Sequence, residues 1–203
     1  MKWEIDERRV PSRAEVKHLL KIARERSEGA ISGGRRQSVI DYAVLVTLVG
    51  SGLRSHELAD LQIRDLRIGH GEGSITVRHG KGDKHRVVAI PDSLKQQLKK
   101  FLHWKQAKDE SFEADAPLFQ SERGGGFCTR AVRHLFKRCL LHAGLDRQYG
   151  VHSMRHFHLS ALYEKTNDLR LVQDQAGHSS ITVTQVYTHV SLDKRRAAVD
   201  RLF

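Results

Sequence analysis

Residues 38–49 constrain the fold of this chain more than any other segment, because they are apolar on nearly every face of a helix. A helix that is apolar all round is buried inside a protein rather than lying on its surface. Ser51 and Gly52 interrupt this segment, and a further short helix is expected at about residues 54–61. The pattern therefore predicts a buried helix followed closely by a short one.

Helical spacing recurs on both sides of this segment. Ser12 and Glu15 have the spacing of a capping box, which predicts a helix from Ser12 to about Arg26. The small residues of segment 29–37 are expected to form a loop. Further helices are expected at residues 93–108, 129–143, 152–164, 169–176 and 181–190, with a tail after residue 190.

Two β-branched segments, residues 74–77 and 86–90, flank the sequence His79-Gly80-Lys81-Gly82-Asp83-Lys84. Such an arrangement is typical of a β-hairpin, here with a glycine-rich and basic turn. The chain shows neither an internal repeat nor a low-complexity linker. We therefore expect a mainly α-helical domain with one small antiparallel β-sheet, of the α+β class.

The charge of the chain favours a polyanionic partner. It contains 35 lysines and arginines against 24 acidic residues, which gives a formal net charge of +11. Nucleic acid is the commonest partner of such a basic protein, although a merely basic soluble protein is the alternative. No apolar run approaches the roughly 18 residues of a membrane helix, and the first residues lack the apolar core of a secretory signal. We therefore expect a cytoplasmic protein that binds no membrane.

The basic charge is concentrated in two places. In the helix expected from Thr129, Arg130, Arg133 and Lys137 share one face, which suits a helix lying along a phosphate backbone. A solvated basic face is the alternative interpretation of this stripe. The residues expected on the opposite, buried face are Val132, Leu135, Phe136, Cys139 and Leu140. The hairpin forms the second basic surface, with Lys81, Lys84, His85 and Arg86.

Several residues of chemical interest are unremarkable when each is taken alone. Arg54 and Glu57 are one helical turn apart, so the carboxylate can orient the guanidinium, but surface pairs of this kind are common. His152 and Arg155 are likewise one turn apart. His152 and His156 also have the spacing of zinc-binding helices, yet no Glu lies between them and no third ligand is indicated. The two cysteines, Cys128 and Cys139, lack a second pair at metal-site spacing and are expected to be reduced thiols.

The order of the motifs is more informative than any one of them. GLRSHEL at 52–58, GKGDKHR at 80–86, HSMRH at 152–156, Gly177-His178 and YTHV at 187–190 follow one another along the chain. This series resembles the tyrosine recombinases, or phage integrases, over about residues 12–190. The resemblance implies the catalytic-domain fold of that family and cleavage of DNA by a tyrosine hydroxyl.

The resemblance also implies a role for each matching residue. Tyr187 corresponds to the nucleophile that forms a 3′-phosphotyrosyl bond. Glu57 corresponds to a residue that contacts the catalytic residues rather than the DNA. Lys81 corresponds to the general acid that protonates the leaving 5′-oxygen, with Lys84 as its nearby rival. The remaining matches are Arg54 and Arg155 for holding the phosphate, His152 for proton transfer with the tyrosine, and His178 for a hydrogen bond to the scissile phosphate.

The family resemblance further implies that neither a metal ion nor a cofactor is needed, and that protomers assemble as dimers or tetramers on paired sites in double-stranded DNA. Lys84, Arg86, Arg130, Arg133 and Lys137 are the expected DNA-binding residues. We expect a single catalytic domain over residues 1–203, without the family's N-terminal DNA-clamping domain and with a C-terminal tail at 191–203. Such a chain is either a fragment or a minimal recombinase, encoded by a prokaryote, a phage or another mobile element and associated with the nucleoid.

Three other functions are compatible with parts of this pattern. A DNA-binding protein that has kept the fold without the activity needs neither a nucleophile nor a hairpin lysine. A type IB topoisomerase shares the chemistry but relaxes supercoils as a monomer. A metal-dependent nuclease fits least, and activity in EDTA would exclude it.

Overall fold

A computed structural model of the chain describes residues 10–33, 35–78, 85–146 and 148–177. The helices are α1 (Arg13–Gly33), α2 (Arg36–Ser51), α3 (Ser55–Ala59), α4 (Asp92–Ala107), α5 (Thr129–His142), α6 (Val151–Thr166) and α7 (Leu169–Ala176). The strands are β1 (Leu66–Arg67), β2 (Ser74–Val77) and β3 (Arg86–Ala89), and a 3-10 turn at Ile63–Asp65 precedes β1. The expected mainly helical fold with a small antiparallel sheet is confirmed. None of the helices within these ranges is long and apolar enough to cross a membrane.

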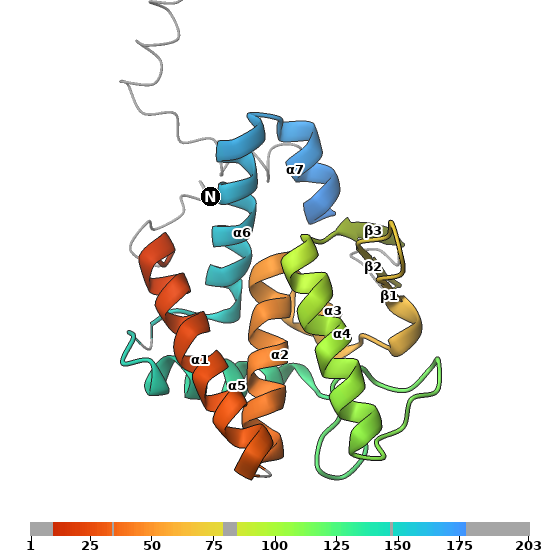
Figure 1. The fold of residues 1–203 in the computed structure, drawn as a ribbon. Coiled ribbons are helices and arrows are strands. Elements are labelled where there is room, and N and C mark those ends of the chain that lie inside the picture. Colours follow the sequence, from red (N-terminus) through yellow and green to blue (C-terminus); the bar gives the residue numbers. More distant parts are fainter. Residues whose placement is uncertain (1–9, 34, 79–84, 147, 178–203) are drawn as a thin grey trace, which may run out of the picture.

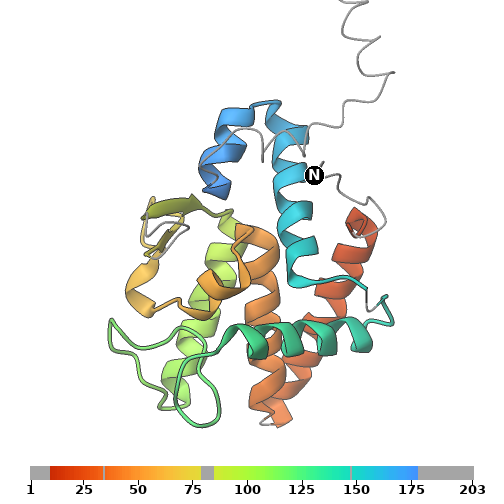
Figure 2. The same ribbon diagram turned by 180° about the vertical axis from the view of Figure 1, so that it is seen from behind.

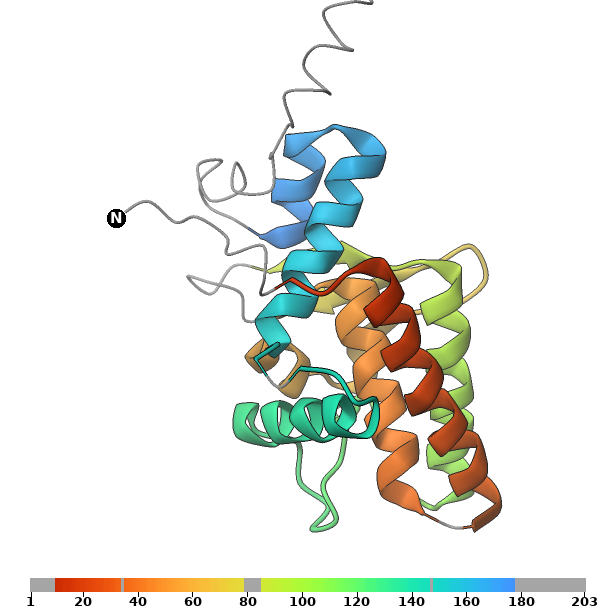
Figure 3. The same ribbon diagram turned by 90° about the vertical axis from the view of Figure 1, so that its left-hand side faces the viewer.

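Helix α2 is the buried helix expected from the sequence. It contacts α1, α3, α4, α5 and α6. In Figure 1, α2 lies between α1 and α4, and Figure 2 shows α5 crossing this layer from behind. Figure 3 shows α5 and α6 on one side of the layer formed by α1, α2 and α4. Because α2 is enclosed in this way, its C-terminal end is held firmly and can position the turn that begins at Gly52.

The prediction of a loop at residues 29–37 was wrong for most of that segment. Helix α1 continues to Gly33, and α2 begins at Arg36. Ala30 is buried in the core, so helix packing outweighs the cost of about 1 kcal/mol for each glycine in a helix. The start of α1 is as expected, because the Ser12 N–H and hydroxyl both donate hydrogen bonds to the Glu15 carboxylate.

The three strands form an antiparallel sheet in the order β1-β2-β3. Ile75 pairs with Val88 and with Leu66, so the hairpin expected from the sequence is confirmed and a third short strand is added to it. Helix α7 lies against β3, where the Gln175 amide pairs with the backbone of Ala89: the side-chain nitrogen donates to the Ala89 carbonyl (2.9 Å) and the side-chain oxygen accepts from the Ala89 N–H (3.1 Å). Gln175 thereby joins the end of α7 to the C-terminal end of β3.

Candidate active site

The turn after α2 presents Arg54 at the edge of the core. Gly52 ends α2 with a φ of 65°, which a glycine adopts without steric cost. A Cβ atom at this position would lie 2.6 Å from Cδ2 of His158, so a side chain would also collide with α6. Leu53 is buried next to this turn, and the Arg54 side chain is 18% exposed. The sequence GLR therefore encodes a tight turn that delivers a partly exposed arginine.

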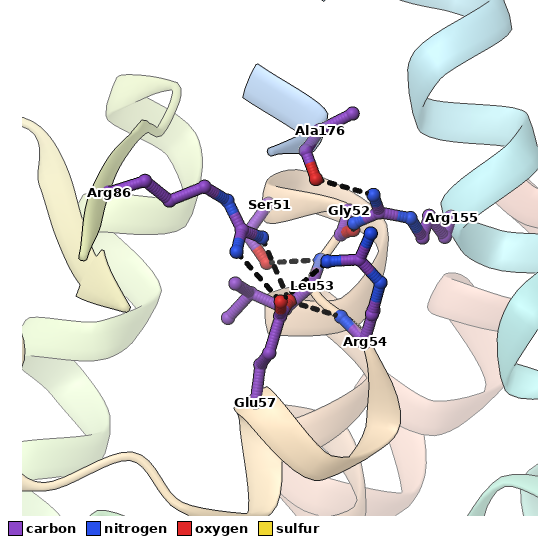
Figure 4. Close-up of polar contacts among 8 residues, drawn as sticks. All are labelled: Ser51, Gly52, Leu53, Arg54, Glu57, Arg86, Arg155 and Ala176. Carbon is purple, nitrogen blue, oxygen red and sulfur yellow. Dashed lines mark hydrogen bonds and ion pairs between the residues drawn. The ribbon is translucent and has the colours of Figure 1, made fainter. Parts of the chain in front are cut away.

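The Glu57 carboxylate is bound by two arginines (Figure 4). Its Oε1 accepts from Nη1 of Arg54 (2.8 Å) and from Nη1 of Arg86 (2.7 Å). Its Oε2 accepts from the Arg54 backbone N–H and from Nη2 of Arg86, both at 2.8 Å. Burial alone would raise the pKa of this carboxyl, but the hydrogen bonds from Arg86 and Arg54 outweigh it and lower the pKa to about 2. Glu57 is thus a permanent anion that orients Arg54.

Arg155 is almost fully buried at the junction of α6, α7 and the α2–α3 turn. Its Nη1 donates to the Gly52 carbonyl (2.7 Å) and its Nη2 to the Ala176 carbonyl (2.6 Å). Both contacts are drawn in Figure 4. The sequence predicted a phosphate-binding role for Arg155, whereas these contacts show that it also holds the end of α7 against the turn that carries Arg54.

His152 opens α6 close to both arginines. Although its side chain is exposed, surrounding protein atoms desolvate the ring, and this effect together with the charges of Arg155 and Arg54 lowers the pKa of His152 below 6.5. The ring of His156 lies edge-on to it, with 4.8 Å between ring centroids, and burial is the main cause that lowers the pKa of His156 to about 4. The lowered pKa favours the neutral imidazole of His152, the form that can accept a proton.

A cleft of about 380 Å³ lies beside these residues. It is lined by Leu53, Arg54, Ser55, His56, Arg133, Phe136, Lys137, Gly150, Val151 and His152. Five of these side chains are cationic or can become so, and no acidic residue occurs among the described residues that line the cleft. Such a lining attracts an anion, although Glu57, behind the cleft, offsets part of the charge of Arg54.

The two faces predicted for α5 are confirmed. Its five expected core residues are the ones that are buried, and Arg130, Arg133 and Lys137 are exposed. Arg133 and Lys137 belong to the cleft, and the Lys137 ammonium donates to the Tyr149 carbonyl at 2.7 Å. Arg130 lies one turn earlier, where its Nε contacts the His134 ring (3.4 Å). The basic stripe therefore extends from the cleft along the surface of the helix.

Other predicted residues lie elsewhere or beyond the described ranges. Arg86 was expected to contact DNA, but its side chain turns inward to Glu57 and is 12% exposed, because the buried carboxylate offers it two hydrogen bonds. Lys81, Lys84, His178 and Tyr187 lie outside the described residues. Within the described ranges, no group of three or more His, Cys, Asp or Glu residues is arranged to hold a metal ion.

Two supporting residues were missed in the sequence. Nδ1 of His158 lies 3.0 Å from the Val49 carbonyl, and its ring fills the space beside Gly52. Gln175 joins α7 to β3. The spacing of neither residue signalled this role, although the position of His158 one helical turn after Arg155 is a signal that the sequence offers.

Comparisons with known proteins identify the family of the chain. The model of the phage integrase family matches residues 11–194. Tyrosine recombinase XerC of Thermodesulfovibrio yellowstonii is 37% identical over 155 residues, which cover 75% of this chain and 50% of the relative. Tyrosine recombinase XerD of Oceanobacillus iheyensis is 34% identical over 157 residues, covering 76% of this chain and 51% of the relative. The chain thus spans about half the length of these relatives.

Solved structures show the same relationship. The crystal structure of XerA recombinase superimposes with a TM-score of 0.75 at 25% identity, over 95% of this chain and 62% of that one. The XerH site-specific recombinase bound to its difH substrate gives a TM-score of 0.75 at 26% identity, over 95% of this chain and 53% of that one. The chain therefore belongs to the phage integrase family of tyrosine recombinases, and its fold is that of the family's catalytic domain.

Proposed function

We propose that this chain is the part of a site-specific recombinase that cleaves and rejoins double-stranded DNA through a 3′-phosphotyrosyl intermediate. The observation that carries the proposal is the cleft, in which Arg54, Arg133, Lys137 and His152 converge without an acidic residue among the described lining. A DNA phosphodiester is the anion that suits a cleft continuous with the basic stripe of α5. The related XerH recombinase, whose structure was solved on its DNA substrate, supports this choice.

In the proposed reaction, the Tyr187 hydroxyl oxygen attacks the scissile phosphorus, and the bond to the 5′-oxygen breaks. An unperturbed tyrosine has a pKa of about 10, so its proton must be removed in place, and neutral His152 is the group proposed to accept it. Arg54 and Arg155 donate hydrogen bonds to the non-bridging oxygens as negative charge gathers there. Lys81 gives a proton to the leaving oxygen. His178 is proposed to bind the same phosphate.

Rejoining is the reverse of this step. A 5′-hydroxyl attacks the phosphotyrosyl phosphorus, and Tyr187 leaves and recovers its proton. The covalent bond conserves the energy of the phosphodiester, so the proposal includes neither a nucleotide cofactor nor a metal ion. We further propose that protomers act as dimers or tetramers on paired DNA sites, in the cytoplasm and at the nucleoid. A single catalytic domain over residues 1–203 stays a prediction.

Trapping the intermediate tests the proposal. The substrate is a pool of nicked duplexes whose sequence is randomised around the nick. Cleavage releases a short fragment with a 5′-hydroxyl, which diffuses away and prevents rejoining. The protein should therefore stay covalently attached to DNA, and the attachment should persist after denaturation. Peptide mapping is expected to place the DNA on Tyr187, and Tyr187→Phe should abolish the adduct while DNA binding remains. Tyr163→Phe, which changes a partly buried tyrosine packed beside Leu159, is the matched control and should form the adduct normally.

Several outcomes would contradict this function. An adduct that persists in Tyr187→Phe would refute the nucleophile, and cleavage that stops in EDTA would indicate a metal-dependent nuclease. Relaxation of plasmids that lack any selected site would favour a topoisomerase. Tight DNA binding with no adduct on any duplex of the pool would leave a DNA-binding protein.

The basic stripe of α5 predicts a change in the salt dependence of binding. Arg133→Ala and Arg130→Ala should each reduce the slope of log affinity against log salt concentration by about one. Arg24→Ala is the control, because Arg24 is exposed on α1 and paired with Glu28 (2.7 Å), so the slope should not change. Binding measured by fluorescence anisotropy between low and physiological salt gives the slopes. An unchanged slope for both α5 variants would place this helix away from the DNA backbone.

A further inference from the structure

Arg86 makes a contact that its position in a basic hairpin does not suggest. Its two terminal nitrogens donate hydrogen bonds to the two carboxylate oxygens of Glu57, at 2.7 and 2.8 Å (Figure 4). A fork of this kind fixes the plane of a carboxylate, which a single hydrogen bond leaves free to rotate. Each oxygen that Arg86 holds also accepts a hydrogen bond from Arg54. The orientation of Arg54 is therefore set by a carboxylate whose own orientation is set by Arg86.

The charges of this cluster follow the same logic. One buried carboxylate is shared by two guanidinium groups, so the three side chains carry a net positive charge. If Arg86 were absent, the whole negative charge of Glu57 would act on Arg54 alone. Arg54 would then present a weaker field to an anion in the cleft, where effective dielectric constants are lower than in water. Arg86 thus affects both the direction and the effective charge of Arg54.

Arg86 also supports the end of α7. Gly177 follows α7 with a φ of 64°, and a Cβ atom there would lie 2.6 Å from Cδ and 2.9 Å from Nε of Arg86. The backbone of Gly177 is therefore packed directly on the Arg86 side chain. Gly177 precedes His178 in the sequence, and Arg86 is the first residue of β3, directly after the segment that contains Lys81. Arg86, the last residue of one motif, thus contacts Glu57 and Gly177, which belong to two others.

We propose that Arg86 is a positioning residue for DNA cleavage, which holds Glu57 so that Arg54 faces the phosphate and which supports the Gly177 backbone ahead of His178. The inference rests on the proposed function, since it assigns Arg86 to the reaction rather than to the DNA surface. Two other roles make different predictions. A DNA contact would change affinity, and a purely structural ion pair would change only stability.

A double-mutant cycle separates these roles. The variants are Arg86→Gln, Arg54→Ala and the double variant. Their cleavage rates are compared in single-turnover reactions at saturating DNA, with a nicked duplex that the wild type cleaves as substrate. Their affinities for this duplex are measured separately. Arg86→Gln is expected to slow cleavage by about ten- to a hundredfold and to change the dissociation constant less than about twofold. In the Arg54→Ala background the same change should slow cleavage only about twofold, because Arg86 acts through Arg54.

The matched control is Arg78→Gln. Arg78 directly follows β2, and its Nε donates to both carboxylate oxygens of Asp65 (2.9 and 3.1 Å), so it is a comparable arginine–carboxylate pair beside the same sheet; within the described residues it forms no hydrogen bond or ion pair with Arg54. Arg78→Gln should have a cleavage rate within about twofold of the wild-type rate. The comparison requires that Arg78→Gln and Arg86→Gln have similar melting temperatures. Arg86→Lys, which keeps the charge but not the fork, should fall between the wild type and Arg86→Gln, and it serves if the glutamine variant does not fold.

A substrate with a neutral methylphosphonate at the scissile position provides a further test. The ratio of wild-type to variant rates on this substrate does not depend on how much of the variant is folded, once it is compared with the same ratio on the phosphate substrate. Less negative charge then develops in the transition state, so the need for Arg54 decreases and the ratio of wild-type to Arg86→Gln rates should shrink. Additive effects in the cycle, an unchanged ratio, or a lost affinity with normal cleavage would each overturn the proposal. Normal cleavage by Arg86→Gln would refute it and leave the proposed function standing, whereas absence of any wild-type adduct would refute both.

Discussion

Replacing Arg155 with alanine is expected to slow DNA cleavage by about a hundred- to a thousandfold and, at the same time, to release the end of α7. The first effect follows from the loss of a fixed hydrogen-bond donor to the transition state. The second follows because the Gly52 and Ala176 carbonyls would lose their bonds to Nη1 and Nη2 of Arg155. Each buried carbonyl left without a partner costs about 1–3 kcal/mol, so stability should fall by about 2–6 kcal/mol in total.

The loosening should be local. Helix α7 contributes Val172 and Ala176 to a small apolar cluster with Leu159, so its attachment depends strongly on polar contacts such as those of Arg155 and Gln175. Hydrogen exchange of the amides of α7 is therefore expected to accelerate in the variant, while exchange in the enclosed α2 changes much less. The measurement is mass spectrometry of peptides from the two helices.

Arg170→Ala provides the matched control for this variant. Arg170 lies on α7 but is 81% exposed, and its ion pair with Asp174 is 3.9 Å long. A surface pair of this kind contributes little, so the stability should change by less than about 0.5 kcal/mol. Unchanged protection of α7 in Arg155→Ala would mean that the arginine does not hold this helix.

The residues that the sequence predicts best are those whose role depends on neighbours along the same element. The two faces of α5 follow from helical periodicity, and the buried and exposed sets occur where that periodicity puts them. The Ser12–Glu15 cap closes within one turn. The order of the motifs was enough to predict the family, because the chemistry of the family requires several residue types at once.

The residues that the sequence predicts poorly are those whose partners come from a distant element. Arg86 follows a basic turn, so it resembles a DNA contact until the fold brings Glu57, 29 positions away, against it. Here a long-range ion pair overrides the local pattern, and periodicity carries no information about it.

Replacing Glu57 with glutamine tests the electrostatic centre of the site through its pH dependence. The pKa of this carboxyl is about 2 in the folded protein, compared with an ordinary value of 4.5. Because the folded pKa is the lower one, the carboxylate stabilises the fold fully above about pH 4.5, and this stabilisation is lost as the pH falls towards 2. The difference between the two pKa values corresponds to about 3 kcal/mol.

The free energy of unfolding of Glu57→Gln should therefore lie about 3 kcal/mol below that of the wild type at pH 7, and the gap should close between pH 4.5 and 2. Urea unfolding of both proteins at a series of pH values measures it. His156 also titrates in this range, but it is present in both proteins and largely cancels from the difference. Glu164→Gln, which removes an exposed partner of Arg13, should show a gap below about 0.5 kcal/mol.

A gap that does not change with pH would mean that the Glu57 side chain stabilises the fold by packing rather than by charge. Cleavage gives an independent check, since Glu57→Gln keeps the size of the side chain but removes the anion between Arg54 and Arg86. Two partly buried guanidinium groups would then repel each other, and Arg54 would turn from the position that the carboxylate enforces. Cleavage is expected to slow by about a hundredfold at pH 7, whereas a rate that stays normal would show that Arg54 finds the phosphate without Glu57.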